Sequence, residues 1–180
     1  MTTTTKQRGS GVARRDRPWE RDIQRLGAEQ AGRFEQLAIA AEADADRGAA
    51  ACALGEWYRE GRDGLRHSPR EARRWYARSA LAGNASGQNN LGACFQHGFG
   101  GPQSYPQAMH WYRTSAAQRV ATAAANLGYL HRLGRGALKH PACALQWFQY
   151  AVEFGDGSEA TRALIEALQG EAHQAAEVWN

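Results

Sequence analysis

The chain repeats one signature three times, at intervals of 36 or 37 residues. Each copy contains a Leu-Gly pair, another glycine six residues after that pair, and an aromatic pair further on. The Leu-Gly pairs begin at Leu54, Leu91 and Leu127, the later glycines are Gly61, Gly98 and Gly134, and the aromatic pairs begin at Trp75, Trp111 and Trp147. A fixed period of this length predicts a stacked solenoid. Because a solenoid offers an extended curved surface, the pattern disfavours a closed catalytic pocket.

The composition of the 180 residues indicates an all-helical protein. The apolar residues are mostly alanines and aromatics, which suit helices, and few are the β-branched residues that favour strands. The formal net charge of +4 comes entirely from residues 1–33, whereas the tail after Val152 is acidic. We interpret this uneven charge mainly as a solvated surface.

Each repeat is predicted to be a helical hairpin. In the first copy Ala51, Leu54 and Tyr58 share one helix face, and Gly61 ends the helix in a left-handed conformation. Ser68 to Glu71 predicts a capping box for the second helix, Ser104 to Gln107 predicts the same start in the second copy, and His140 predicts a poorer cap in the third. The second helices are expected to bury Ala72, Trp75, Tyr76 and Ala80, then Ala108, Trp111, Tyr112 and Ala116, then Ala144, Trp147, Phe148 and Val152.

The spacing also predicts where the copies differ and how the stack ends. Gly61 and Trp75 lie fourteen residues apart, against thirteen in the other copies, so the extra residue is expected in the loop 62–68. Residues 1–17 are expected to be a disordered basic arm, 18–47 to form an N-terminal capping helix or helices with Gly27 and Gly32 as candidate breaks, 48–157 to form the three repeats, and 158–180 to form C-terminal capping helices divided at Gly170, the second ending at Trp179.

These motifs resemble the Sel-one-like repeat (SLR) family, relatives of the tetratricopeptide repeat. The resemblance lies in the pattern Leu-Gly-x-x-aromatic-x-x-Gly followed by Ala-x-x-Trp-Tyr-x-x-x-Ala-x-x-Gly over roughly residues 48–157. It implies an all-α fold, a right-handed α-α superhelix (solenoid) of three SLR hairpins between N- and C-terminal capping helices. Family members act as adaptors and scaffolds, many of them in bacteria.

Three features depart from the family pattern. His131 replaces the first-helix aromatic that Tyr58 and Phe95 supply. Arg119 stands where Gly83 and Gly155 end the second helix, which predicts a strained or altered turn. Cys52, Cys94 and Cys143 occupy three different repeat positions, which argues against the disulfide-rich secreted branch. A reducing cytoplasm fits this odd number of cysteines best.

No constellation of catalytic residues is recognisable, so the chain is predicted to be no enzyme and to need no cofactor. Cys94 and His97 have the spacing of half a zinc site, but no second pair accompanies them. We interpret them as a core cysteine beside a surface histidine. The glycine-rich stretches 98–101 and 134–136 follow helices rather than strands, so we interpret them as hairpin turns.

The resemblance places the candidate binding residues on the first helices, which build the concave wall in tetratricopeptide-type hairpins. The residues expected to line this groove are Glu56, Arg59, Ser86, Asn89, Ala93, Gln96, His97, Tyr129 and Arg132. Polar side chains with an occasional aromatic suit an extended peptide or a partner helix. For Asn89, Asn90 and Asn126 the alternative is that they satisfy backbone groups between helices.

The expected partner is another protein. The sequence specifies neither the identity of that partner nor the oligomeric state of this chain. The alternative is nucleic acid or an anionic surface, bound through the arginines of residues 1–33. Four acidic residues interrupt those arginines, and no aromatic residues interleave them as single-strand binding requires, so a protein is favoured. No stretch resembles a membrane span or a secretory signal.

Overall fold

A computed structural model describes residues 17, 19–43 and 46–177, and this part of the chain is helical without strands. The helices are α1 (Glu20–Ile23), α2 (Ala28–Ala43), α3 (Ala49–Glu60), the short 3-10 helix η1 (Arg62–Gly64), α4 (Pro69–Leu81), α5 (Ala85–His97), α6 (Tyr105–Ala116), α7 (Ala121–Leu133), α8 (Pro141–Glu153) and α9 (Glu159–Glu177). The all-α prediction is confirmed. The predicted basic arm lies outside the described residues, apart from Arg17.

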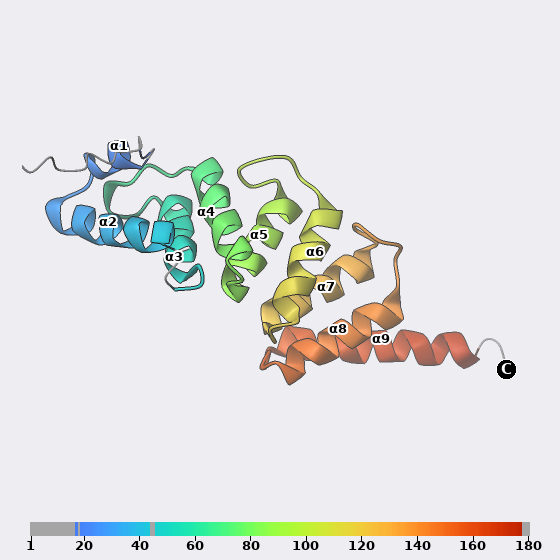
Figure 1. Cartoon of the computed structure of the whole chain (residues 1–180). Coiled ribbons are helices and arrows are strands. Elements are labelled where there is room, and N and C mark those ends of the chain that lie inside the picture. Colours follow the sequence, from blue (N-terminus) through green and yellow to red (C-terminus); the bar gives the residue numbers. More distant parts are fainter. Residues whose placement is uncertain (1–16, 18, 44–45, 178–180) are drawn as a thin grey trace, which may run out of the picture.

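The helices α3 to α8 form three antiparallel hairpins stacked one after another, so that the molecule is elongated (Figure 1). Each hairpin pairs a first helix (α3, α5, α7) with a second helix (α4, α6, α8), and each second helix also packs on the first helix of the next repeat. The helix α2 covers one end of the stack and α9 covers the other. The predicted solenoid is therefore confirmed.

A main-chain hydrogen bond ties the two helices of each hairpin across their loop. The amide of Ser68 donates to the Tyr58 carbonyl at 2.9 Å, and its hydroxyl accepts from the Glu71 amide at 3.4 Å. The Glu71 carboxylate pairs with Arg74 instead of reaching back to Ser68. The predicted capping box is thus half right: the serine caps the helix, but the neighbouring helix satisfies the serine amide.

The same tie recurs in the other two hairpins. The Ser104 amide donates to the Phe95 carbonyl at 2.8 Å, and the His140 amide donates to the His131 carbonyl at 3.0 Å. His140 also caps α8, because its Nδ1 atom accepts from the Cys143 amide at 3.1 Å. The prediction of a poorer cap is therefore wrong: an imidazole nitrogen does here what the serine hydroxyl does in the other copies.

The second aromatic of each pair, rather than the tryptophan, fills the centre of the hairpin. Tyr76, Tyr112 and Phe148 are fully buried, and Trp75 is buried too, but Trp111 and Trp147 are only half-buried. Trp111 and Trp147 each pack on a core cluster that contains residues of their own repeat and of the preceding one. The prediction that all three tryptophans are buried is therefore wrong for Trp111 and Trp147, which keep part of their surface exposed. Val152, also predicted to be buried, is half-buried, and its neighbour Ala151 is the fully buried residue.

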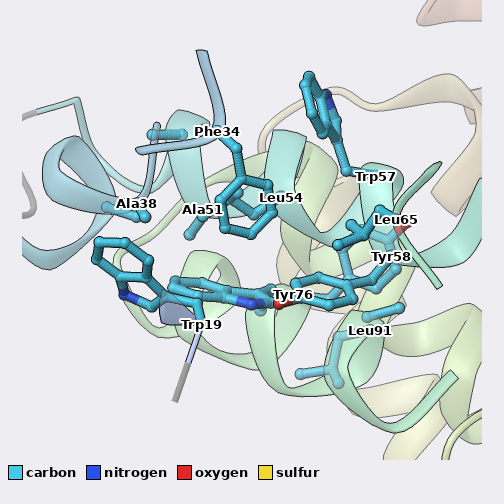
Figure 2. Packing of buried hydrophobic residues seen from close by; sticks show 14 of the residues in the cluster. Trp19, Phe34, Ala38, Ala51, Leu54, Trp57, Tyr58, Leu65, Tyr76 and Leu91 are labelled. Atoms are coloured by element: carbon cyan, nitrogen blue, oxygen red, sulfur yellow. The ribbon is translucent and has the colours of Figure 1, made fainter. Parts of the chain in front are cut away.

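The N-terminal segment packs on the first repeat through aromatic contacts. The Phe34 ring on α2 lies 5.8 Å from the rings of both Trp57 and Tyr58 on α3, and 6.3 Å from Trp19 (Figure 2). Trp19 donates through Nε1 to Glu42 at 3.0 Å, which fixes the start of α1 against the end of α2. Of the two candidate breaks, Gly27 separates α1 from α2, and Gly32 lies inside α2.

The C-terminal cap is one continuous helix. The helix α9 passes through Gly170 without interruption, so the predicted division into two helices is wrong, and Trp179 lies outside the described residues. A single glycine costs a helix only about 1 kcal/mol relative to alanine and does not end it where no turn residues follow. Leu164, Ile165 and Leu168 on α9 pack against the core around Phe148.

Two predicted irregularities are confirmed. The backbone of Arg119 is left-handed, with φ 62°, as Gly83 and Gly155 are at the same place in the other copies. The extra residue of the first hairpin lies between Gly61 and Ser68, where the chain forms η1. The insertion stays in the loop because the tie between Tyr58 and Ser68 holds the helix ends in register.

Candidate protein-binding groove

The first helices of consecutive repeats are joined directly through polar side chains. Asn90 on α5 donates to Oε1 of Glu56 on α3 at 2.8 Å, and Asn126 on α7 lies 3.5 Å from Oδ1 of Asn89 on α5. These asparagines therefore bond to side chains of the neighbouring first helix rather than to backbone groups. The bonds form a polar row that crosses from repeat to repeat.

A hollow of about 420 Å³ lies between α3 and α5. Glu56, Arg59 and His97, all predicted groove residues, line it together with Ala93. The lining is completed by Tyr76, Asn90, Cys94 and Phe99. The structure thus brings one part of the predicted groove together at the junction of the first and second repeats.

The charged side chains of this hollow compensate one another. The Arg59 guanidinium contacts Glu56 through Nε at 2.9 Å and Glu60 through Nη2 at 2.9 Å, and Arg62 contacts Glu60 on its other side. Exposed ion pairs of this kind contribute about 0–1 kcal/mol each. A partner that offers its own charged or polar groups can therefore replace them at little cost.

Two buried groups at the hollow stay in their neutral forms. Burial raises the pKa of the Cys94 thiol to about 11, so this cysteine is a poor nucleophile and a poor metal ligand. Burial, and the nearby Glu56 carboxylate, also raise the pKa of the Tyr76 phenol well above its usual value. Cys94 is buried and His97 is exposed, as we interpreted them, and the described residues contain no group of three or more possible metal ligands.

Several other predicted groove residues lie outside the hollow. The Gln96 side chain accepts a hydrogen bond from the Tyr112 hydroxyl at 2.9 Å. The Tyr129 ring meets Phe148 edge-on at 5.1 Å, which makes it partly a core residue. Ser86 is exposed near the start of α5, and Arg132 is half-buried on α7. The predicted residues thus extend along three first helices instead of forming a single pocket.

The sequence reasoning did not single out Asn90 or Tyr76 as groove residues. A signal for Asn90 exists, since residues 86, 90, 93 and 97 follow the helical period and share one face of α5. For Tyr76 the signal is a difference between the repeats: Arg59 stands where the next copy has Gln96.

A second hollow, of about 620 Å³, lies beside the start of α4 and carries both signs of charge. Arg25, Arg66 and Arg70 line it together with two acids, Asp22 and Glu71. The Asp22 carboxylate accepts from the Tyr58 hydroxyl at 2.7 Å. This mixture gives no uniformly positive surface.

No helix in the described part of the chain is both long and apolar enough to cross a membrane.

The stacked hairpins and the polar row along their first helices define an α-solenoid built from helical repeats. The Sel1 repeat family matches residues 48–84, 85–120 and 121–156, and the chain therefore belongs to this family. Proteins with Sel1 repeats generally serve as protein-interaction scaffolds and are typically not catalysts. A search of curated protein sequences gives no match.

Three solved structures with the same fold are bacterial proteins. A Sel1 repeat protein from Oxalobacter formigenes is 37% identical, with TM-score 0.57, over 61% of this chain and 43% of that one. The protein c5321, a protective antigen of uropathogenic Escherichia coli with an SLR fold, is 31% identical, with TM-score 0.62, over 68% and 26%. Cysteine-rich protein B of Helicobacter pylori shares the fold at 18% identity and TM-score 0.53, over 73% and 96%. The chain spans less than half the length of the first two.

Proposed function

We propose that this protein is a non-catalytic adaptor that holds a segment of a partner protein, an extended peptide or a helix, along its first helices. The hollow between α3 and α5 is the observation that carries the proposal, because Glu56, Arg59, Ala93 and His97 converge there from two repeats. Its mixed lining of apolar and polar side chains suits a peptide side chain, and the balanced charges argue for a protein rather than for a polyanion.

The three cysteines support a reducing compartment for this function. Cys52, Cys94 and Cys143 are all free thiols, and Cys94 is buried. Disulfides are rare in the cytosol, whereas small secreted domains often depend on them. We therefore place the adaptor in the cytoplasm.

A selection from a random displayed-peptide library on the immobilised protein tests the proposal. We expect peptides that bind the native protein and lose binding to the Ala93→Arg variant, whose side chain fills the hollow. Ala163→Arg is the matched control, because Ala163 is exposed on α9, far along the chain from the hollow. Circular dichroism confirms that both variants remain helical. Failure to enrich peptides, or equal binding by Ala93→Arg, would refute the groove.

A further inference from the structure

The three hairpins differ at one interior hydrogen bond. The repeats differ in the fifth residue after the leucine of each Leu-Gly pair and in the second aromatic: the combinations are Arg59 with Tyr76, Gln96 with Tyr112 and Arg132 with Phe148. In the second repeat the Tyr112 hydroxyl donates to Oε1 of Gln96 at 2.9 Å. In the third repeat the phenylalanine has no hydroxyl to satisfy. Only the first repeat combines a tyrosine with a side chain that cannot accept a hydrogen bond.

The Tyr76 hydroxyl is buried and has no hydrogen-bond partner. Glu56 and Arg59 lie beside it, but neither meets it with hydrogen-bond geometry. Both oxygens of Glu56 already accept hydrogen bonds, one from Asn90 and the other from Arg59. A buried donor without a partner destabilises the folded state by about 1–3 kcal/mol, so its presence calls for an explanation. The other fully or nearly buried tyrosines, Tyr58 and Tyr112, both have acceptors.

Tyr76 also lines the hollow between α3 and α5. Of the remaining lining, Arg59 is a donor, Ala93 and Phe99 are apolar, and Asn90 is hydrogen-bonded to Glu56. A volume of about 420 Å³ accommodates one inserted side chain. The group that the Tyr76 hydroxyl lacks is a hydrogen-bond acceptor.

We infer that the hollow receives a glutamine or asparagine side chain of the partner peptide, whose amide oxygen accepts the hydrogen bond of Tyr76. The inference rests on the proposed groove. The second repeat shows the required chemistry within the protein itself, because the Gln96 amide satisfies the equivalent tyrosine. A neutral amide suits the site better than a carboxylate, since the Glu56 carboxylate borders it and Arg59 is already paired with two carboxylates.

The library selection described above supplies the test. Among peptides that Ala93→Arg fails to bind, we expect one position enriched in glutamine or asparagine. Tyr76→Phe should bind such a peptide about fivefold more weakly than the native protein, the change that one neutral hydrogen bond gives. Replacing the peptide glutamine by methionine should weaken native binding equally, and the two changes together should weaken it no further.

Matched variants separate this hydrogen bond from general effects on the fold. Tyr112→Phe removes the equivalent hydroxyl, which already donates its hydrogen bond to Gln96, so peptide affinity should not change. Arg59→Gln copies the second repeat and supplies an internal acceptor, so the preference for an amide should disappear. In the absence of peptide, Tyr76→Phe should unfold at or above the native temperature, and Tyr112→Phe below it.

The outcomes distinguish the two proposals. Peptides that require the open hollow but show no preference for an amide would leave the groove intact and overturn the inference. Native affinity in Tyr76→Phe, or a Tyr76→Phe protein that unfolds well below the native temperature, would also overturn it. A selection that enriches no peptide at all would overturn both.

Discussion

Gly92 faces the ring of Tyr112 so closely that a methyl group on its Cα would lie 2.7 Å from two ring carbons. Gly55 stands in the same relation to Tyr76, at 2.5 Å, and Gly128 to Phe148, at 2.7 Å. The glycine of each Leu-Gly pair therefore provides the space for the aromatic side chain at the centre of its hairpin.

Replacing Gly92 by alanine should destabilise the protein. The added methyl group overlaps a fully buried ring that has no room to move, and overpacking of this kind costs about 1–3 kcal/mol. Gly32→Ala is the control, because Gly32 also lies in a helix and its new methyl group would meet nothing within 4 Å. It should be neutral or raise stability by up to about 1 kcal/mol. Urea unfolding followed by circular dichroism measures both, and an equal effect of the two changes would contradict the assignment.

The two aromatics of a pair should differ in their contribution to stability. Tyr112→Ala leaves a cavity in the hairpin and should cost about 3–5 kcal/mol. Trp111→Ala should cost clearly less, because that ring is only partly buried. Thermal unfolding of both variants would decide the point. A larger loss for Trp111→Ala would restore the tryptophan spine that the sequence predicts.

The sequence predicts the repeats and their order because the signature residues are those that pack. Leu54, Gly61 and Tyr76 each repeat a contact or a backbone conformation, and such a requirement recurs with the period. The periodicity does not distinguish the two members of an aromatic pair, since Trp111 and Tyr112 recur at the same interval. Which of them points into the hairpin depends on how the second helix is rotated against the first.

The groove is less predictable than the fold for a similar reason. The helical period places Glu56, Arg59 and His97 on inner faces, but it does not show that Gln96 turns toward Tyr112. That contact depends on side-chain choices between helices that no single-helix pattern contains. Comparing equivalent positions across the repeats points to this contact. Gln96 is equivalent to an arginine in the other two copies, and Tyr112 is equivalent to Phe148, which has no hydroxyl.

Arg119→Gly should stabilise the turn after the second repeat. A left-handed backbone costs a residue with a side chain about 1–2 kcal/mol, which glycine avoids. The change also removes the ion pair of Arg119 with Glu153 and its contact over the Phe154 ring, each an exposed interaction of about 1 kcal/mol or less. Arg119→Ala keeps the unfavourable backbone and loses the same contacts, so it is the control. We expect the glycine variant to unfold at a higher temperature than the alanine variant; the reverse order would refute the strain.

The stability of the third repeat should fall in mild acid because of His131. Burial lowers the pKa of its imidazole, with Arg113 and His140 adding repulsion, and its Nδ1 atom has no hydrogen-bond partner. In the unfolded chain histidine titrates near about 6.5. As the pH falls below that value, the unfolded chain gains a proton that the folded protein does not take up, so the free energy of unfolding decreases; well above it, titration has no effect.

The variant His131→Phe, which supplies the aromatic found in the second repeat, should remove this part of the acid sensitivity. Its advantage over the native protein should be larger at about pH 5 than at about pH 8, as chemical denaturation at both values would show. An advantage independent of pH would show that the imidazole titrates alike in the folded and unfolded states.

Ser115→Ala should weaken the second repeat. The buried Ser115 hydroxyl donates to the Ala85 carbonyl at 2.8 Å, as the Ser79 hydroxyl does to the Gly48 carbonyl at 2.7 Å. Loss of one such bond costs about 0.5–1.5 kcal/mol. Ser86→Ala, at an exposed position of α5, should change stability by less than about 0.5 kcal/mol. Equal midpoints in urea for both variants would contradict a structural role for the hydroxyl.

The main-chain tie between Tyr58 and Ser68 gives the first loop a use in engineering. Within this loop Leu65 packs in the core, whereas Arg62 and Gly64 are exposed, and the loop already holds one residue more than its counterparts while α3 and α4 keep their packing. A short epitope grafted after Arg62 would thus be presented to an antibody without shifting either helix. The molecule has a built-in attachment point for labels, separate from the surface that we expect a partner to occupy.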